Sequence, residues 1–150
     1  MHTRLPLAAL ALMLCAAPAL AQQGSPNTTP GTVTRVVLIH IKAGHADPFW
    51  ADLRQHGKAV FDEEKRQGII TNYTVATKST TDSPDDWNVA LTFTYPNWAA
   101  FDNFGSRIDP ITLAHYGSAA NRTAAAMARV EHSTTVASFL LRGQTLNPWK

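Results

Sequence analysis

Residues 34–77 read TRVVLIHIKAGHADPFWADLRQHGKAVFDEEKRQGIITNYTVAT and predict a strand, a helix and a second strand, in that order. The same order returns in residues 87–142. Two such units packed side by side predict an α+β fold in which a four-stranded antiparallel sheet carries helices on one face. This fold is a scaffold for many activities, so function has to be argued from particular residues.

The first predicted helix has clear ends. Asp47 and Pro48 open it, because an Asp side chain can cap backbone amides and Pro suits the first helical position. Gly68 closes it after Gln67. Apolar residues recur in it at helical spacing and predict a stripe that faces the sheet. The stripe comprises Phe49, Leu53, His56 and Val60.

The second unit is predicted from alternation and turn signals. Residues 87–95 alternate, which places Trp87, Val89, Leu91, Phe93 and Tyr95 on one buried face. Asn97 can cap a short helix at Trp98, and Asp109 with Pro110 can open a longer one. Its stripe is Leu113, Tyr116, Ala120, Ala124 and Met127, and its many alanines predict close packing on the sheet.

The last strand, residues 134–142, is apolar on both faces. We therefore expect the open sheet face to be covered by a second subunit, as a homodimer.

The N-terminus predicts export. Arg4 precedes the apolar run LPLAALALMLCAAPAL, and small residues follow, which together describe a signal peptide over residues 1–21 cleaved after Ala21. A retained anchor or a lipid attached to Cys15 are the alternatives. We predict a secreted or periplasmic protein with no stable membrane insertion after cleavage, a flexible leader over 22–32 and a single domain over 33–150.

Composition excludes several classes of function. Removal of 21 of the 150 residues leaves 129, enough for one domain. Loss of Arg4 leaves 12 basic and 11 acidic residues, so there is no basic field for nucleic acid. The single cysteine lies in the signal peptide, which excludes disulfides and thiolate chemistry from the mature chain. No histidine or carboxylate spacing converges on a metal, and we predict neither metal nor cofactor.

Three segments resemble a known family. VVLIHIKAGH (36–45), EEKRQGII (63–70) and DDWNVALTFTYPNWAAFD (85–102) are similar to dimeric α+β barrel proteins of ferredoxin-like topology, βαββαβ, which include antibiotic-biosynthesis-type monooxygenases. The resemblance covers about residues 36–142 and is nearest to secreted bacterial members without a settled activity. It implies a dimer and a pocket between sheet and helices. Haem-degrading members use an Asn of the first strand, where this chain offers His40.

Histidines are the sharpest catalytic candidates. His56 lies in the stripe that faces the sheet, where an imidazole could act as a general base, although a hydrogen-bonded core histidine is the structural alternative. His40 is in the middle of the first strand and faces either the pocket or the dimer barrel. His115 is off the main stripe, which predicts an exposed side chain.

Aromatic residues complete the predicted pocket. We expect His56 as the catalytic residue, with Tyr73, Trp87, Trp98 and His40 contacting a small apolar or aromatic ligand. The resemblance favours cofactor-independent oxygenation with His56 as the base. The alternatives are a non-catalytic envelope or stress protein whose pocket is filled by its own side chains, and a haem-binding protein that uses His56 or His115.

Overall fold

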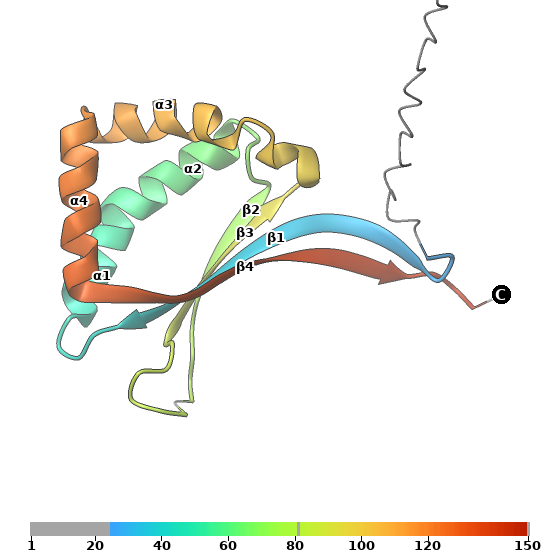
Figure 1. Ribbon diagram of the computed structural model, residues 1–150, viewed down its shortest axis with the longest axis horizontal. Helices are drawn as coiled ribbons and strands as arrows, with labels where there is room; N and C mark the ends of the chain where they lie inside the picture. Colours follow the sequence, from blue (N-terminus) through green and yellow to red (C-terminus); the bar gives the residue numbers. More distant parts are fainter. Residues whose placement is uncertain (1–24, 81, 150) are drawn as a thin grey trace, which may run out of the picture.

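The computed structural model of this protein describes residues 25–80 and 82–149 (Figure 1). The predicted signal peptide over 1–21 and its cleavage after Ala21 lie outside the described residues, as do residues 22–24 of the predicted leader.

Four antiparallel strands form one sheet, in the order β2-β3-β1-β4. They are β1 (Thr28–Ile41), β2 (Asn72–Thr77), β3 (Val89–Tyr95) and β4 (Ser133–Leu146). Every helix lies on one face of this sheet (Figure 1). The predicted α+β, ferredoxin-like fold is therefore confirmed by the strand order and the single helical layer.

The first helical segment is continuous but changes its winding. It consists of α1 (Ala46–Asp52), the π-helix η1 (Leu53–Gly57) and α2 (Lys58–Arg66). Its predicted end at Gly68 is confirmed by a φ of 68°, a conformation that glycine adopts without a steric penalty. Its predicted start is wrong by two residues. His45 occupies the N-cap without a capping hydrogen bond from its side chain, and Asp47 lies inside the first turn.

The hydrophobic core lies between the sheet and the helical layer. As predicted, alternate residues of β3 are buried, namely Val89, Leu91, Phe93 and Tyr95. Trp87 was expected to share that face, but it precedes β3 and is only half-buried. The residues of β1 and of the helices that complete the core are Val33, Ile39, Phe49, Val60, Ala100 and Ile111, with Ile69 and Ile70 between α2 and β2.

The predicted flexible leader is partly wrong, because β1 begins at Thr28. The first residues of β1 pair with the end of β4, with Thr28 opposite Leu146 and Pro30 opposite Gln144. These two strand ends form an arm that extends beyond the helical layer (Figure 1). Pro30 fits there because β3 pairs with β1 only from Val33 onward, so this part of β1 is a sheet edge. Long-range pairing has overridden the local turn signals of the leader.

The second helical region differs most from the prediction. A short 3-10 helix, η2 (Trp98–Phe101), confirms the predicted turn at Trp98, although the side chain of Asn97 makes no capping hydrogen bond. The longer helix opens at Phe104 rather than at Asp109, and Pro110 lies inside it. It ends at Gly117, whose φ is 75°, so the expected single stripe is divided between α3 (Phe104–Tyr116) and α4 (Ala119–His132).

Helix α4 stands away from the sheet. None of its residues is buried, and Met127 is 66% exposed. The predicted close packing of its alanines against the sheet is therefore wrong. Gly117 and the Ser118 cap turn the chain so that α4 runs along the edge of the helical layer, where a cavity separates it from β1 and β4.

The face of the sheet that carries no helices presents apolar side chains to solvent. The register places Val36 opposite Phe139 and Leu38 opposite Ala137, and Phe139 and Leu141 are 42% and 51% exposed. The homodimer through this open sheet face stays a prediction.

Candidate functional site

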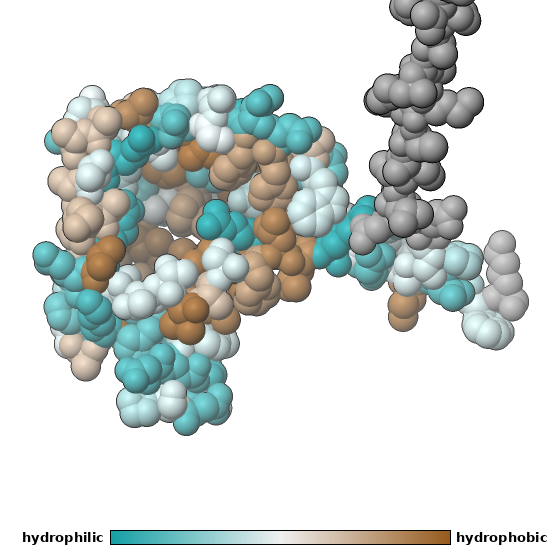
Figure 2. All heavy atoms as spheres, viewed as in Figure 1, coloured by the Kyte–Doolittle hydropathy of each residue, from teal (hydrophilic) through white to brown (hydrophobic). Residues whose placement is uncertain are grey.

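A cavity of about 620 Å³ lies between α4, the first helical segment and the sheet. Figure 2 shows a hollow beside α4 with apolar side chains inside it. Its lining is mainly apolar and includes Ile39, Phe49, Leu53, Val60, Phe61, Leu91, Ala126 and Val130. Its polar lining side chains include Asp52, His56, Thr112, Tyr116, Arg122 and Arg129. Pockets for small ligands are commonly about 300–1,000 Å³ with this mixture of many apolar groups and few polar ones.

The π-helix η1 forms one wall of this cavity. A π-helical turn inserts one residue into an α-helix and is frequent at functional sites. Gly57 allows the turn to pack, because a Cβ at this position would lie 2.7 Å from Cδ1 of Leu53 and 3.3 Å from the Phe61 ring. The same turn presents His56 to the cavity.

His56 is hydrogen-bonded to a second histidine. Its Nδ1 lies 2.9 Å from Nε2 of His115 at the end of α3, and one ring donates its N–H to the other. The ring of Tyr116 lies 5.2 Å from that of His56 between centroids. Because this contact occupies Nδ1, Nε2 is the nitrogen of His56 that remains for a ligand.

Arg129 of α4 joins the polar side of the cavity. Its Nη1 donates a hydrogen bond to the Tyr116 hydroxyl at 3.2 Å, and its Nε lies 3.9 Å from Oδ2 of Asp52. Burial raises the pKa of Tyr116, and the charge of Arg129 partly offsets that rise. The phenol of Tyr116 is therefore neutral at physiological pH and supplies a dipole rather than a charge.

Arg122 lies two turns before Arg129 on the same face of α4, so both line the cavity. Its Nη1 donates to Oδ1 of Asp109 at 2.8 Å and to the Thr112 hydroxyl at 2.9 Å. The Asp109 side chain is 61% exposed, so water reaches this ion pair.

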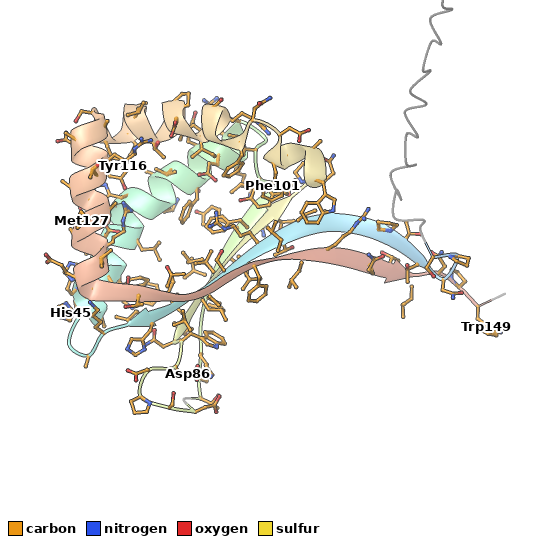
Figure 3. All side chains as sticks on the ribbon, viewed as in Figure 1. His45, Asp86, Phe101, Tyr116, Met127 and Trp149 are labelled. Carbon is orange, nitrogen blue, oxygen red and sulfur yellow. The ribbon has the colours of Figure 1, made fainter. Side chains whose placement is uncertain are left out.

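Both ends of α4 are fixed. The Ser118 hydroxyl accepts a hydrogen bond from the Asn121 amide and caps the first turn. At the other end Nδ1 of His132 lies 3.0 Å from Nδ1 of His45. Figure 3 shows Tyr116 near the first of these ends and His45 near the second. Contacts at both of its ends therefore hold α4 beside the cavity.

The structure does not bring the predicted site residues together. His56 lines the cavity, but Tyr73 lies in a smaller groove of about 240 Å³ on the other side of Leu53 and Phe61. The Tyr73 hydroxyl donates to Asp62. Trp98 is 45% exposed and packs beside Phe101, away from the cavity lining.

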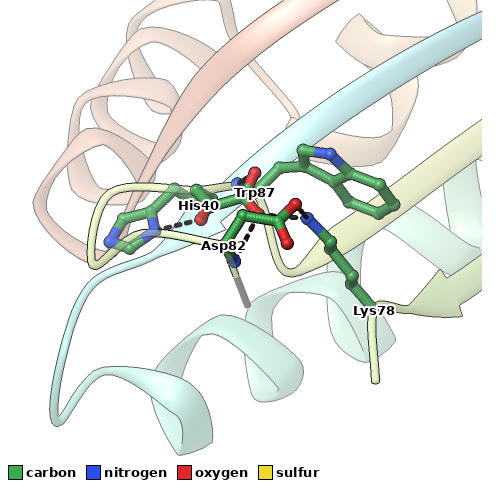
Figure 4. Close-up of polar contacts among 5 residues, drawn as sticks. His40, Lys78, Asp82 and Trp87 are labelled. Carbon is green, nitrogen blue, oxygen red and sulfur yellow. Dashed lines mark hydrogen bonds and ion pairs between the residues drawn. The ribbon is translucent and has the colours of Figure 1, made fainter. Parts of the chain in front are cut away.

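His40 and Trp87 belong to a polar cluster at the end of the sheet (Figure 4). Nδ1 of His40 donates to the backbone carbonyl of Asp86 at 2.7 Å. Lys78 pairs with Asp86 and lies over the Trp87 ring, with 5.0 Å between Nζ and the ring centroid. The hydrogen bond from Lys78 holds the pKa of Asp86 below its usual range. These contacts fix the loop between β2 and β3 and leave His40 and Trp87 outside the cavity.

Sequence reasoning missed the cavity residues of α4. Arg122, Ala126 and Arg129 recur at spacings of four and three, which places them on one helical face. That pattern was present in the sequence, but it was obscured by the assumption of one long helix with a different apolar stripe.

Two classes of site are absent from the described part of the chain. Across residues 25–80 and 82–149, no three His, Cys, Asp or Glu side chains gather closely enough to hold a metal ion. Within the same ranges, no helix has the length and apolar character needed to cross a membrane.

Two solved structures that are similar to this chain are both dimeric ferredoxin-like proteins. No known family and no curated protein matches this chain. A solved dimeric protein of unknown function with a ferredoxin-like fold, from Bacteroides fragilis, is 13% identical and aligns over 77% of this chain and 96% of its own, with a TM-score of 0.40. A dimeric ferredoxin-like protein from an uncultured marine organism is 11% identical over 81% of this chain and 99% of its own, with a TM-score of 0.44.

Proposed function

We propose that this protein binds a small, largely apolar molecule in the cavity beneath α4. The observation that carries the proposal is the position of α4, which has no buried residue and faces a cavity of about 620 Å³. Helices in proteins gain most of their stability from packing an apolar face. A ligand in the cavity would give α4 the packing partner that the sheet does not provide.

The size of the cavity argues against one alternative. A pocket filled by the protein's own side chains would leave little space between α4 and the sheet, whereas the space is about 620 Å³. The floor is formed by side chains such as Ile39, Phe49 and Leu91, which favour an apolar body.

Binding can be tested by filling the cavity. Ala126 lines it and Ala128 lies on another face of the same helix. We expect an aromatic and lipid-like panel to raise the Tm of the wild-type protein, because a ligand that binds only the folded state stabilises it. Ala126→Phe should abolish the shift, and the matched variant Ala128→Phe should retain it. If no compound shifts the wild-type Tm, the binding proposal fails.

We further propose a catalytic role for His56, as the base of a cofactor-independent oxygenation. The supporting observation is the hydrogen bond between Nδ1 of His56 and Nε2 of His115, beside the cavity that His56 lines. In the tautomer in which Nδ1 of His56 is the donor, its Nε2 carries no proton and can act as a base. Nε2 would take a proton from an activated phenol or enol, giving an imidazolium and a bound anion. The anion would then reduce dioxygen and form a carbon–oxygen bond, and the resulting peroxide would take the proton back from His56. Loss of water from this hydroperoxide leaves a carbonyl group on the product, so one oxygen atom is incorporated and the other leaves as water.

Oxygen uptake tests this second proposal. With a panel of quinols and enols, His56→Ala should lose at least 100-fold in rate, the scale of general base catalysis. Tyr73→Phe is the control, because Tyr73 lies in a separate groove. Oxygen uptake that is unchanged in His56→Ala would contradict the role of His56 and would leave the binding proposal intact.

The cellular location of the protein is also a proposal. We propose that the protein is exported and that its signal peptide is removed after Ala21. N-terminal sequencing of the protein isolated from its own host's envelope should begin at Gln22.

A further inference from the structure

We propose that the ligand of the cavity is an amphiphilic organic acid, whose carboxylate is held by Arg129, with Arg122 as a second positive charge, and whose apolar body lies on the sheet. This inference rests on the proposed binding function and adds the chemical class of the ligand. It follows from the way charge and apolar surface are divided between the two sides of the cavity.

The positively charged side chains of the cavity come from its α4 side, and the acidic side chain comes from α1. Arg122 and Arg129 come from α4, and Asp52 is the acidic residue among the lining side chains. The lining therefore carries two positive charges and one negative charge, before any charge on His56. A partly buried net positive charge favours an anionic ligand, because fewer water molecules remain there to screen it.

Arg129 is suited to hold a carboxylate. Its contact with Asp52 is 3.9 Å long, which is an ion pair beyond ordinary hydrogen-bond distance. Its hydrogen bond to Tyr116 involves Nη1, and guanidinium carries five N–H donors in a planar fork. Arg129 thus combines a loose intramolecular ion pair with a fork that matches a carboxylate in two-point geometry.

Arg122 provides the second positive charge. Its partner Asp109 is 61% exposed, so water screens that pair. Because Arg122 and Arg129 are two turns apart, they lie about 10 Å apart along α4 at 1.5 Å per residue. This separation is between backbone positions, so the acid group would bind at Arg129, and Arg122 would add positive charge further along α4, with Ala126 leaving space between the two arginines.

The opposite side of the cavity selects the rest of the molecule. Ile39 and Leu91 come from the sheet, and Phe49, Val60 and Phe61 come from the first helical segment. None of these side chains can donate or accept a hydrogen bond, so a polar body placed on them would lose its hydration without compensation. Ser133, Thr134 and Thr135 of β4 add hydroxyl groups to the sheet side of the lining. The cavity thus fits one acidic group on a largely apolar molecule.

Three probes of equal chain length test the sign of the preferred charge. We would measure the affinities of decanoate, decanol and decylamine for the mature protein at neutral pH by calorimetry, with Tm shifts alongside. Decanoate should bind best and decylamine worst. Arg129→Gln should weaken decanoate binding about tenfold, the scale of a hydrogen bond to a charged group, and should leave decanol unchanged.

Matched variants distinguish a loss of decanoate affinity from a loss of folding. Arg129→Lys keeps the charge and should retain a preference for decanoate. Asp52→Asn removes the competing carboxylate and should tighten decanoate binding several-fold. Arg54→Gln is the control, since exposed Arg54 lies on the same helical segment but lines other grooves.

The possible outcomes separate the two proposals. Equal binding of decanol and decanoate, unaffected by Arg129→Gln, would overturn the acid preference while supporting an apolar ligand. Tightest binding of decylamine would also overturn it. If none of the three probes binds and the aromatic and lipid-like panel also fails, both the proposed function and this inference fail.

Discussion

Glu64 shows how burial determines the charge of a single residue. It is 7% exposed at the end of α2, and desolvation raises its pKa to about 7, although Arg35 partly opposes the rise. A carboxyl whose pKa is raised in the folded state stabilises the fold when protonated. That stability is present below the ordinary value of 4.5 and is lost as pH rises through about 7.

Replacing Glu64 with Gln should remove this pH dependence. At pH 8 we expect Glu64→Gln to be more stable than wild type, by up to about 3 kcal/mol from the size of the pKa shift, and at pH 4.5 the two should be similar. Urea unfolding at both pH values measures the difference. Glu63→Gln is the matched control with the opposite sign, because hydrogen bonds from Arg66 and Gln67 lower the pKa of exposed Glu63 to about 2. Parallel stability curves for Glu64→Gln and wild type would contradict this account.

Gly57 permits the packing of the π-turn. In Gly57→Ala the new Cβ would crowd Leu53 and Phe61, and overpacking of this kind costs about 1–3 kcal/mol. We also expect weaker ligand binding, because both neighbours line the cavity. Gly105→Ala is the control, since a Cβ at position 105 in α3 meets nothing within 4 Å and should stabilise the helix by about 0.5–1 kcal/mol. Thermal unfolding of both variants distinguishes crowding from helix propensity.

Among the α-helices, α4 is the least buried, because α1, α2 and α3 each contain at least one buried residue and α4 contains none. Since none of its residues is buried, we expect its amide hydrogens to exchange faster than those of α2, which buries Val60 and Glu64. A bound ligand should slow the exchange of α4 selectively. Hydrogen exchange with mass spectrometry, with and without decanoate, tests this. Equal protection of α4 and α2 without ligand would show that α4 is held by more than its ends.

The Ser118 cap should matter more than an exposed serine usually does. Loss of an N-cap costs about 1 kcal/mol, and α4 has little packing to offset that loss. Ser118→Ala should therefore speed the exchange of amide hydrogens in α4 while the global Tm stays nearly unchanged. Ser118→Asp should restore the slower exchange. A lower Tm without faster exchange in α4 would contradict a local effect.

Sequence reasoning was reliable where local and long-range preferences agreed. The alternation in β3 and the glycine at position 68 predicted a buried strand and a helix end correctly, because burial and turn geometry act locally there. It failed where neighbours in space decide the outcome. Pro110 indicated a helix start but lies inside α3, and residues 28–31 join the sheet only because β4 is long enough to pair with them.

The candidate site shows the same difference between features set by local sequence and features set by neighbours in space. Helical spacing placed His56 on the stripe that includes Phe49, Leu53 and Val60, and all four residues line the cavity, although the His56 ring contacts His115 and Tyr116 of α3. Residue type alone led to the prediction of four further site residues, Tyr73, Trp87, Trp98 and His40. The type of a residue does not determine which cavity its side chain lines. Arg129 was missed, because its role depends on the break at Gly117 that turns α4 over the cavity.

The whole molecule has one further surface to account for, the open face of the sheet. We expect a homodimer through it, because Phe139 and Leu141 are exposed there beside Val36 and Leu38 of β1. Phe139→Asp should yield monomers, whereas Leu140→Asp, one residue along on the opposite face of β4, should leave the dimer intact. Native mass spectrometry gives the answer. A wild-type monomer, or loss of the dimer in both variants, would contradict an interface on the open face.

The pairing of β1 with β4 also determines when this chain can fold. Thr28 meets Leu146, so the longest strand pair joins the beginning of the described chain to its end, and closing so long a loop is entropically costly and slow. The sheet cannot be completed before the last strand has been synthesised. Loss of residues 142–146 would remove the pairing partner of the first residues of β1, whereas the hydrophobic core, to which β4 contributes no buried residue, would keep all of its side chains.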